Sequence, residues 1–276
     1  MKIDAHQHFW LYNSKEYDWI SDAEKVIKHD FLPSDLAPIL RANNLDGCVA
    51  IQARQSLQET DWLIDLAQKN DVIKAVVGWI DIQSNNLTEQ LAKYKSFSIL
   101  KGFRHVLQGE PSDFMLKPAF INGLKTLEQK GYTYDLLVLA HQLPHTIKLV
   151  EQFESLKLVI DHIAKPEILA KKGFNEWKTA MFTLAEKPNV YCKVSGMVTE
   201  ADINHWKPED FTQYLTVVFR AFGVKRVMFG SDWPVCLLAG EYAQIKQIIE
   251  AFVLANYPDN FEDVFGNNAV EFYRIS

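Results

Sequence analysis

The sequence predicts a (β/α)8 TIM barrel, the parallel eight-stranded α/β fold in which each strand is followed by a helix. Apolar runs of strand length alternate with longer segments of helical spacing along the chain, and eight runs can be counted. Strands that are apolar on both faces are typical of parallel sheets covered by helices. Eight repeats favour a closed barrel over an open doubly wound sheet, because no Gly-x-Gly-x-x-Gly follows the first run.

The first strand is expected at residues 2–8, where Ile3 and Ala5 alternate with Asp4, His6 and His8. Residues 9–32 are rich in aromatic side chains and have neither the helical nor the strand period. They are expected to form a long loop, which either belongs to a binding site or plugs one end of the barrel. Pro33 then favours the start of a helix that runs to residue 43.

The remaining segments keep the alternation without interruption. Strands are expected at 47–52, 73–80, 100–106, 132–138, 157–162, 190–195 and 226–230, and helices at 57–69, 87–95, 115–129, 144–153, 174–185, 208–222 and 242–255. No shift in composition marks a linker, so we expect residues 1–276 to form a single domain.

Composition narrows the classes of partner and compartment. The net charge is -6 and the isoelectric point is near 5.8. These values argue against a nucleic-acid partner, because the protein has no excess of positive charge to attract phosphate. No apolar run is long enough for a membrane span, and no signal peptide is evident. Three widely spaced cysteines do not suggest a disulfide framework. We therefore expect a cytoplasmic protein that acts on a small molecule.

Polar side chains gather at the predicted carboxyl ends of the strands, where barrel enzymes carry their active sites. His6 and His8 are two apart on a strand and point to the same face, so they can hold a metal or polarise a carbonyl. The other strand-end groups are Arg104, His105, Gln108, His141, Asp161, His162, Lys165, Lys193 and Asp232.

Each of these groups also has a structural interpretation. Asp232 is costly to bury unless it is paired or functional, although it could cap the next helix. Arg104 either forms an ordinary ion pair or binds a carboxylate or sugar hydroxyls. Lys165 and Lys193 either belong to the site or neutralise neighbouring carboxylates.

Four motifs carry a resemblance to a known family. They are Asp-Ala-His-Gln-His-Phe-Trp at 4–10, Gly-Phe-Arg-His at 102–105, Asp-His-Ile-Ala-Lys-Pro at 161–166 and Gly-Ser-Asp-Trp-Pro at 230–234. With these, the chain resembles the amidohydrolase superfamily from end to end, and within it the sugar-lactone hydrolase branch. That branch includes L-fuconolactonase, L-rhamnonolactonase and 2-pyrone-4,6-dicarboxylate lactonase-like proteins. Residues 265–273 resemble the family's terminal Gly-Asn-x-Ala helix.

The resemblance implies hydrolysis of a sugar lactone such as L-fucono- or L-rhamnonolactone. Asp232 would be the general base on water, and His6, His8 and His162 would polarise the carbonyl. The bridging ligands of binuclear members are missing, so no metal is expected to be required. A single zinc ion held by His6, His8 and Asp232 stays open.

Further residues are expected to contact the substrate, and two other functions remain open. Arg104, His105, Gln108 and His141 would bind hydroxyls or a carboxylate, and Trp10 and Trp233 would form a stacking wall. The alternatives are a metal-dependent amidohydrolase or decarboxylase on the same barrel and a binding protein without turnover. A homodimer is compatible with the exposed aromatic residues.

Overall fold

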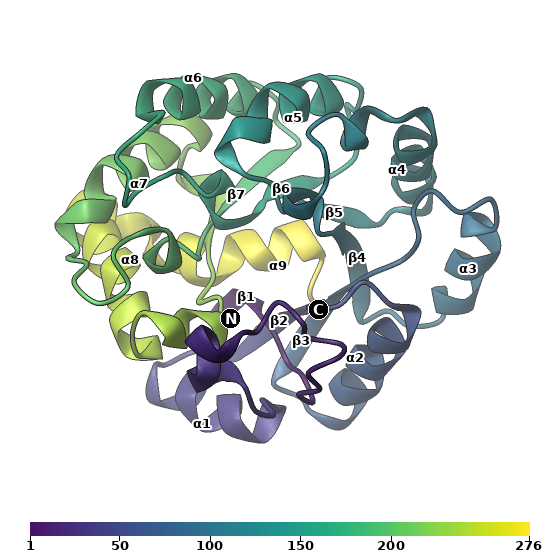
Figure 1. Cartoon of the computed structure of the whole chain (residues 1–276), viewed down its shortest axis with the longest axis horizontal. Helices are drawn as coiled ribbons and strands as arrows, with labels where there is room; N and C mark the ends of the chain where they lie inside the picture. Colours follow the sequence, from purple (N-terminus) through teal and green to yellow (C-terminus); the bar gives the residue numbers. More distant parts are fainter.

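Eight parallel strands pair in the order β1 to β8 and are surrounded by helices, as the computed structural model of all 276 residues shows (Figure 1). The strands are β1 (Ile3–Gln7), β2 (Gly47–Ile51), β3 (Ile73–Gly78), β4 (Leu100–His105), β5 (Thr133–Leu136), β6 (Leu158–Ile160), β7 (Val190–Val194) and β8 (Val227–Phe229). The sheet closes where His8 N–H donates to Trp233 O at 2.7 Å and Asp232 N–H donates to His6 O at 2.8 Å. The predicted barrel is confirmed, although β5, β6 and β8 are shorter than expected.

A helix follows each strand, and a ninth ends the chain. The helices are α1 (Pro33–Ala42), α2 (Leu57–Lys69), α3 (Leu87–Tyr94), α4 (Pro118–Lys130), α5 (Leu143–Val150), α6 (Phe174–Ala185), α7 (Glu209–Phe222), α8 (Tyr242–Asn256) and α9 (Asn268–Tyr273). The helix expected at 115–129 begins only at Pro118, because residues 114–116 form a separate 3-10 turn. None of the helices combines the length and the apolar character needed to span a membrane.

Local sequence explains where α2 and α4 begin and end. Ser56 caps α2 by accepting a hydrogen bond from Glu59 N–H, and Pro118 occupies the first turn of α4. Gly131 ends α4 in the left-handed conformation at φ 78°, which only glycine adopts without a steric penalty.

The segment at 9–32 contains more structure than a loop. Trp10 and Phe31 exchange backbone hydrogen bonds of 3.0 and 2.9 Å, and residues 22–27 form a 3-10 helix capped by Ser21. Trp10 and Phe31 also pack edge to face, with ring centroids 5.5 Å apart. The segment is therefore folded, and Phe31 packs it against Trp233, although no sequence period indicated this.

The barrel interior is apolar at the end where the strands begin and polar at the end where the strands finish. The apolar side chains of this interior cluster include Ile3, Val49, Val77, Val159 and Met228, and Phe272 and Tyr273 of α9 join them. The terminal helix crosses the middle of the barrel in projection (Figure 1). It therefore closes the end of the barrel where the strands begin, and it leaves the opposite end for polar groups.

In strand β1 the side chains depart from strict alternation between the two faces of the sheet near His6. A register shift against β2 lies between Asp4 and Gln7. Ala5 packs in the interior cluster, and the next residue, His6, also contacts interior groups. Alternation alone would have placed these neighbours on opposite faces, so the irregularity turns His6 into the barrel.

Candidate active site

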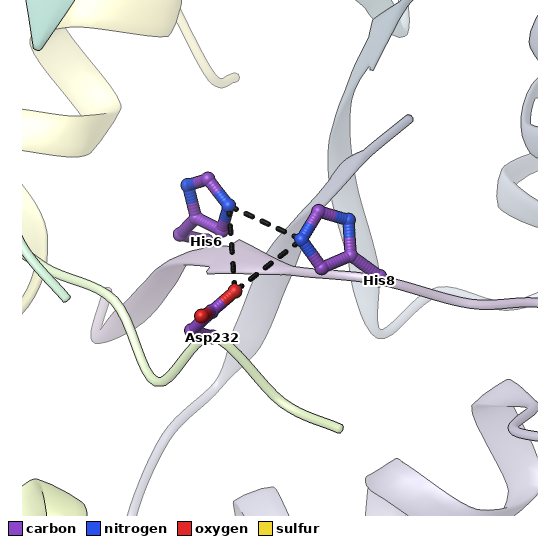
Figure 2. Close-up of side chains that lie close together, drawn as sticks. All are labelled: His6, His8 and Asp232. Atoms are coloured by element: carbon purple, nitrogen blue, oxygen red, sulfur yellow. Dashed lines mark hydrogen bonds and ion pairs between the residues drawn. The ribbon is translucent and has the colours of Figure 1, made fainter. Parts of the chain in front are cut away.

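His6, His8 and Asp232 converge at the carboxyl end of the barrel (Figure 2). The Nε2 atoms of the two histidines are 3.3 Å apart. Asp232 Oδ1 lies 3.4 Å from His8 Nε2 and 3.8 Å from His6 Nε2. The three side chains come from the first strand and from the segment after the last strand, so closure of the barrel assembles the cluster.

His162 joins the cluster from the end of β6. Its Nε2 lies 3.9 Å from Asp232 Oδ1, and its Nδ1 is 2.9 Å from Ser195 Oγ. Residues 162–165 all have positive φ between 46° and 60°. A left-handed turn of four non-glycine residues is unfavourable by about 1–2 kcal/mol per residue, and such strain is concentrated at functional sites. The turn places the His162 ring beside Asp232.

The cluster combines the ionised carboxylate of Asp232 with the neutral imidazoles of His6 and His162. Burial raises the pKa of Asp232, but His162 and the contact with His8 outweigh it, so this pKa lies below its usual value. Burial lowers the pKa of His6 and that of His162 well below the usual histidine value, although Asp161 and Asp232, respectively, oppose this. A carboxylate that is ionised at neutral pH beside neutral rings suits a general base.

The donor set also fits a zinc ion. Zinc bound tetrahedrally at about 2.0–2.1 Å keeps its ligand atoms about 3.4 Å apart. Two edges of the triangle, at 3.3 and 3.4 Å, match that spacing, and the His6–Asp232 edge is longer at 3.8 Å. Two nitrogens and one oxygen leave a fourth position open, as in catalytic zinc sites.

Beneath the cluster lies a buried platform of four charged residues. Asp161 Oδ2 accepts from Arg104 Nη1 at 3.0 Å, and Lys193 Nζ lies 3.0 Å from Asp161 Oδ1 and 2.5 Å from Asp135 Oδ2. Burial raises the pKa of Asp135 to about 6, whereas the ammonium of Lys193 and His6 overcome burial at Asp161 and hold its pKa well below the usual value. Two cations balance two carboxyl groups, so little net charge is buried.

The sequence showed only part of this platform. Arg104 was expected at the site, and Lys193 was expected to be either a site residue or a neutralising partner. Asp135 was not predicted, because it lies within β5 and not among the polar residues that follow a strand. The available signal was position, since Asp135, like Arg104, alternates with buried apolar neighbours on a short strand and must face the interior.

A further buried carboxylate, that of Asp4, joins β1 to the segments that follow β8. Asp4 accepts hydrogen bonds from Ser231 Oγ at 2.6 Å, Tyr242 Oη at 2.9 Å and the backbone N–H groups of Ser231 and His6. Burial raises the pKa of Asp4 to about 6, despite these donors. Asp4 therefore fixes the backbone on both sides of the cluster and does not face it.

Several predicted substrate-binding residues do not reach the cluster. His105 points to the opposite side of β4 from Arg104, where it stacks on Phe114 and pairs with Glu110 at 3.0 Å. His141 is exposed on a 3-10 turn after β5. Trp10 is 0% exposed and donates its Nε1–H to His29 O, so neither ring face is free.

Three other predicted residues keep unsatisfied polar atoms. Arg104 Nε, Gln108 Oε1 and Trp233 Nε1 are buried without a hydrogen-bond partner. Buried polar groups in proteins are almost always paired, so these atoms are available to a ligand.

Comparison with known proteins places this arrangement in a family. A family model described as amidohydrolase matches residues 3–275. The chain belongs to the amidohydrolase family. The resemblance inferred from the strand-end motifs is thereby confirmed.

Two curated relatives and one crystal structure cover nearly all of this amidohydrolase. The chain is similar to an L-fucono-1,5-lactonase of Burkholderia multivorans, with 38% identity over 263 residues that cover 91% of this chain and 88% of the relative. It is 34% identical to an L-fucono-1,5-lactonase of Burkholderia ambifaria, over 99% and 96% of the two chains. A crystal structure of an amidohydrolase from Burkholderia multivorans with bound zinc superposes with a TM-score of 0.96 at 36% identity, over 100% of both chains.

Proposed function

We propose that this amidohydrolase adds water to a sugar lactone, an aldonolactone such as L-fucono- or L-rhamnonolactone, and releases the open-chain sugar acid. The observation that carries the proposal is the convergence of ionised Asp232 with His6, His8 and His162 at the barrel's carboxyl end. Identity of 38% to an L-fucono-1,5-lactonase across most of the chain supports the substrate class.

In the proposed reaction Asp232 is the general base. Its carboxylate takes a proton from water as the water oxygen bonds to the lactone carbonyl carbon. The resulting tetrahedral intermediate collapses by breaking the bond to the ring oxygen, and protonated Asp232 returns the proton to that alkoxide. The product is a hydroxy acid, whose ionisation releases one proton to solvent.

His6 and His162 stabilise the charge that develops on the carbonyl oxygen, and His8 orients His6 by accepting its hydrogen bond. His6, His8 and His162 direct Nε2 toward the region around Asp232 Oδ1. Removing a donor aimed at such an oxyanion costs about 3–4 kcal/mol of barrier stabilisation. Asp232, His8 and His162 keep 3–5% exposure while His6 and Lys193 have none, so the substrate approaches from the side of the first three.

We assign recognition of the sugar hydroxyls to the residues with free polar atoms. Gln108 Oε1 accepts a hydroxyl hydrogen, whereas Arg104 Nε and Trp233 Nε1 donate to hydroxyl oxygens. His105 and Trp10 are engaged with Glu110 and His29 O, and exposed His141 is left as a contact for the outer part of the substrate.

We propose further that a metal is optional. His6, His8 and Asp232 would hold a zinc ion, which when bound acts as a Lewis acid on the carbonyl oxygen. The crystal structure of the similar amidohydrolase from Burkholderia multivorans contains bound zinc, which supports zinc binding by this chain. We place the enzyme in the reducing cytoplasm, because Cys48, Cys192 and Cys236 are all free and buried.

Acid release measured with a pH indicator tests the proposal. The substrates are L-fucono-, L-rhamnono-, D-galactono- and D-arabinonolactone, each with and without chelator, and light scattering on the same sample decides whether a homodimer forms. Rapid opening of one configuration that resists chelation is the expected result. No turnover of any lactone, together with zinc-dependent amide hydrolysis or decarboxylation, would replace the lactonase proposal by the metal-dependent alternative.

A further inference from the structure

The hydrogen-bonding partners of His8 fix its tautomer. His8 Nδ1 lies 2.8 Å from the carbonyl oxygen of Ile51, which can only accept a hydrogen bond. Nδ1 of His8 therefore carries a proton. In the neutral ring Nε2 then has a lone pair, and this lone pair faces His6.

That assignment favours one of the two tautomers of His6. The two Nε2 atoms form a hydrogen bond of 3.3 Å, so His6 must donate through Nε2 when His8 accepts. Nδ1 of neutral His6 is then a bare acceptor. Lys193 Nζ lies 3.2 Å from this Nδ1 and can only donate. The donors and acceptors form one consistent chain, from Lys193 through His6 and His8 to Ile51 O.

Lys193 is held in place for this contact. Its side chain is 0% exposed on β7, and Asp135 and Asp161 fix the ammonium at 2.5 and 3.0 Å. Tyr273 of α9 donates to Asp135 at 2.8 Å from below. A buried ammonium with a closed set of partners has a fixed direction, so its hydrogen bond to His6 is predetermined.

We propose that Lys193 is a positioning residue that keeps the proton of His6 on Nε2, so that His6 can donate to the developing oxyanion without a metal. The inference rests on the proposed lactone hydrolysis. It explains why an ammonium lies under a histidine that, as a simple zinc ligand, would need only the neighbouring carboxylate.

Zinc binding requires the opposite tautomer. A zinc ligand must offer the Nε2 lone pair, and the proton of His6 would then move to Nδ1 and face Asp161 Oδ1 at 3.3 Å. Arg104 Nη1, at 3.3 Å from Nε2, favours this second state, although Asp161 and Gln52 O also accept from its guanidinium. Lys193 and Arg104 thus compete for the single lone pair of His6, and Lys193 favours the metal-free state.

The test replaces Lys193 without leaving an unbalanced charge. The variant Lys193→Met/Asp135→Asn removes one cation and one carboxylate together, and Asp135→Asn alone is the reference. In chelated enzyme we expect the double variant to lose about 100-fold in kcat against the reference, the size of a lost oxyanion donor, with KM unchanged. Its zinc affinity should rise about tenfold, in the range of changes to the partners of metal ligands.

A spectroscopic readout separates positioning from stability. Nitrogen-15 NMR of the imidazoles in chelated enzyme should place the His6 proton on Nε2 in wild type and on Nδ1 in the double variant, with His6→Gln used for assignment. Equal metal-free kcat in double variant and reference, or a wild-type His6 protonated on Nδ1, would overturn the inference. If wild type opens no lactone, the proposed function fails, while the NMR measurement still decides the tautomer.

Discussion

Asp232 is held by its backbone as firmly as by its side chain. Its φ of 60° lies in the left-handed region, and its N–H donates to His6 O at 2.8 Å. A non-glycine residue in this conformation costs free energy, so the position is retained where the side chain has a role. The carboxylate consequently points at the histidines and not into the following 3-10 turn as a helix cap.

Replacing Asp232 by Asn tests the role of the base. The amide keeps the shape of the carboxylate but cannot accept a proton from water, so we expect kcat for lactone opening to fall about 10³-fold, within the usual range for general bases. Unfolding by urea should change little because the backbone contacts remain. Acid release by purified variant and wild type, measured side by side, decides the point; a rate near wild type would remove Asp232 from the mechanism.

At the scale of strands and turns, sequence rules predicted the location of the site better than its orientation. Polar residues at strand ends correctly marked His6, His8 and Asp232 as neighbours. Arg104 and His105 were expected to act together, yet adjacent strand residues face opposite sides and only Arg104 faces the interior. The left-handed turn at 162–165 could not be predicted, because no glycine marks it and tertiary contacts alone impose it.

The turn that follows β7 positions His162, which gives a matched pair of glycine variants. A Cβ at Gly196 would lie 2.4 Å from His162 Nδ1, whereas a Cβ at Gly173 would meet nothing within 4 Å. Their φ values are similar, at 60° and 63°, so alanine should cost each about 1 kcal/mol of stability. Only Gly196→Ala displaces His162. The kcat of this variant should fall about 100-fold, because a small displacement of a catalytic group has an effect of that size. Equal kinetics in the two variants would show that His162 needs no exact placement.

The start of α2 contains a carboxyl group that makes stability depend on pH. Glu59 accepts from Ala53 N–H at 3.1 Å and Arg54 N–H at 2.6 Å, and burial raises its pKa from 4.5 to about 7. The folded state therefore keeps its proton after the unfolded state has released it, so this group lowers stability as pH rises from about 5 to 7.

Glu59→Gln should remove that dependence. The free energy of unfolding of wild type minus that of the variant should fall by about 3 kcal/mol between pH 5 and pH 8, since one pKa unit corresponds to about 1.4 kcal/mol. Urea unfolding of both proteins at several pH values measures this difference. Parallel stability curves would mean that Glu59 is ionised at pH 5 in the folded protein.

At the scale of the whole molecule, the barrel stacks three layers along its axis. An apolar layer closed by α9 supports the charged platform, and the platform supports the histidine–aspartate cluster. The sequence predicted the bottom and top layers from apolar runs and strand ends. Of the middle layer the sequence named Arg104, Asp161 and Lys193, but neither Asp135 nor the pairing of these groups, which joins residues as far apart in the chain as Tyr273 and Asp135, 138 residues. Such pairs become visible only once the barrel closes.

Because the candidate zinc ligands come from the first strand and from the segment after the last strand, a bound ion should stabilise the fold as a whole. His6 and His8 lie on β1 and Asp232 follows β8, so an ion would join the strands that close the sheet. An ion that binds only the folded state adds about 2.7 kcal/mol to the free energy of unfolding at a hundredfold excess over its Kd. Zinc titrated into wild type from which metal has been removed should therefore raise the free energy of unfolding, measured with urea, by that amount. His8→Gln, which leaves the platform intact, should show little of the effect. Equal stabilisation of both proteins would place the ion outside the cluster.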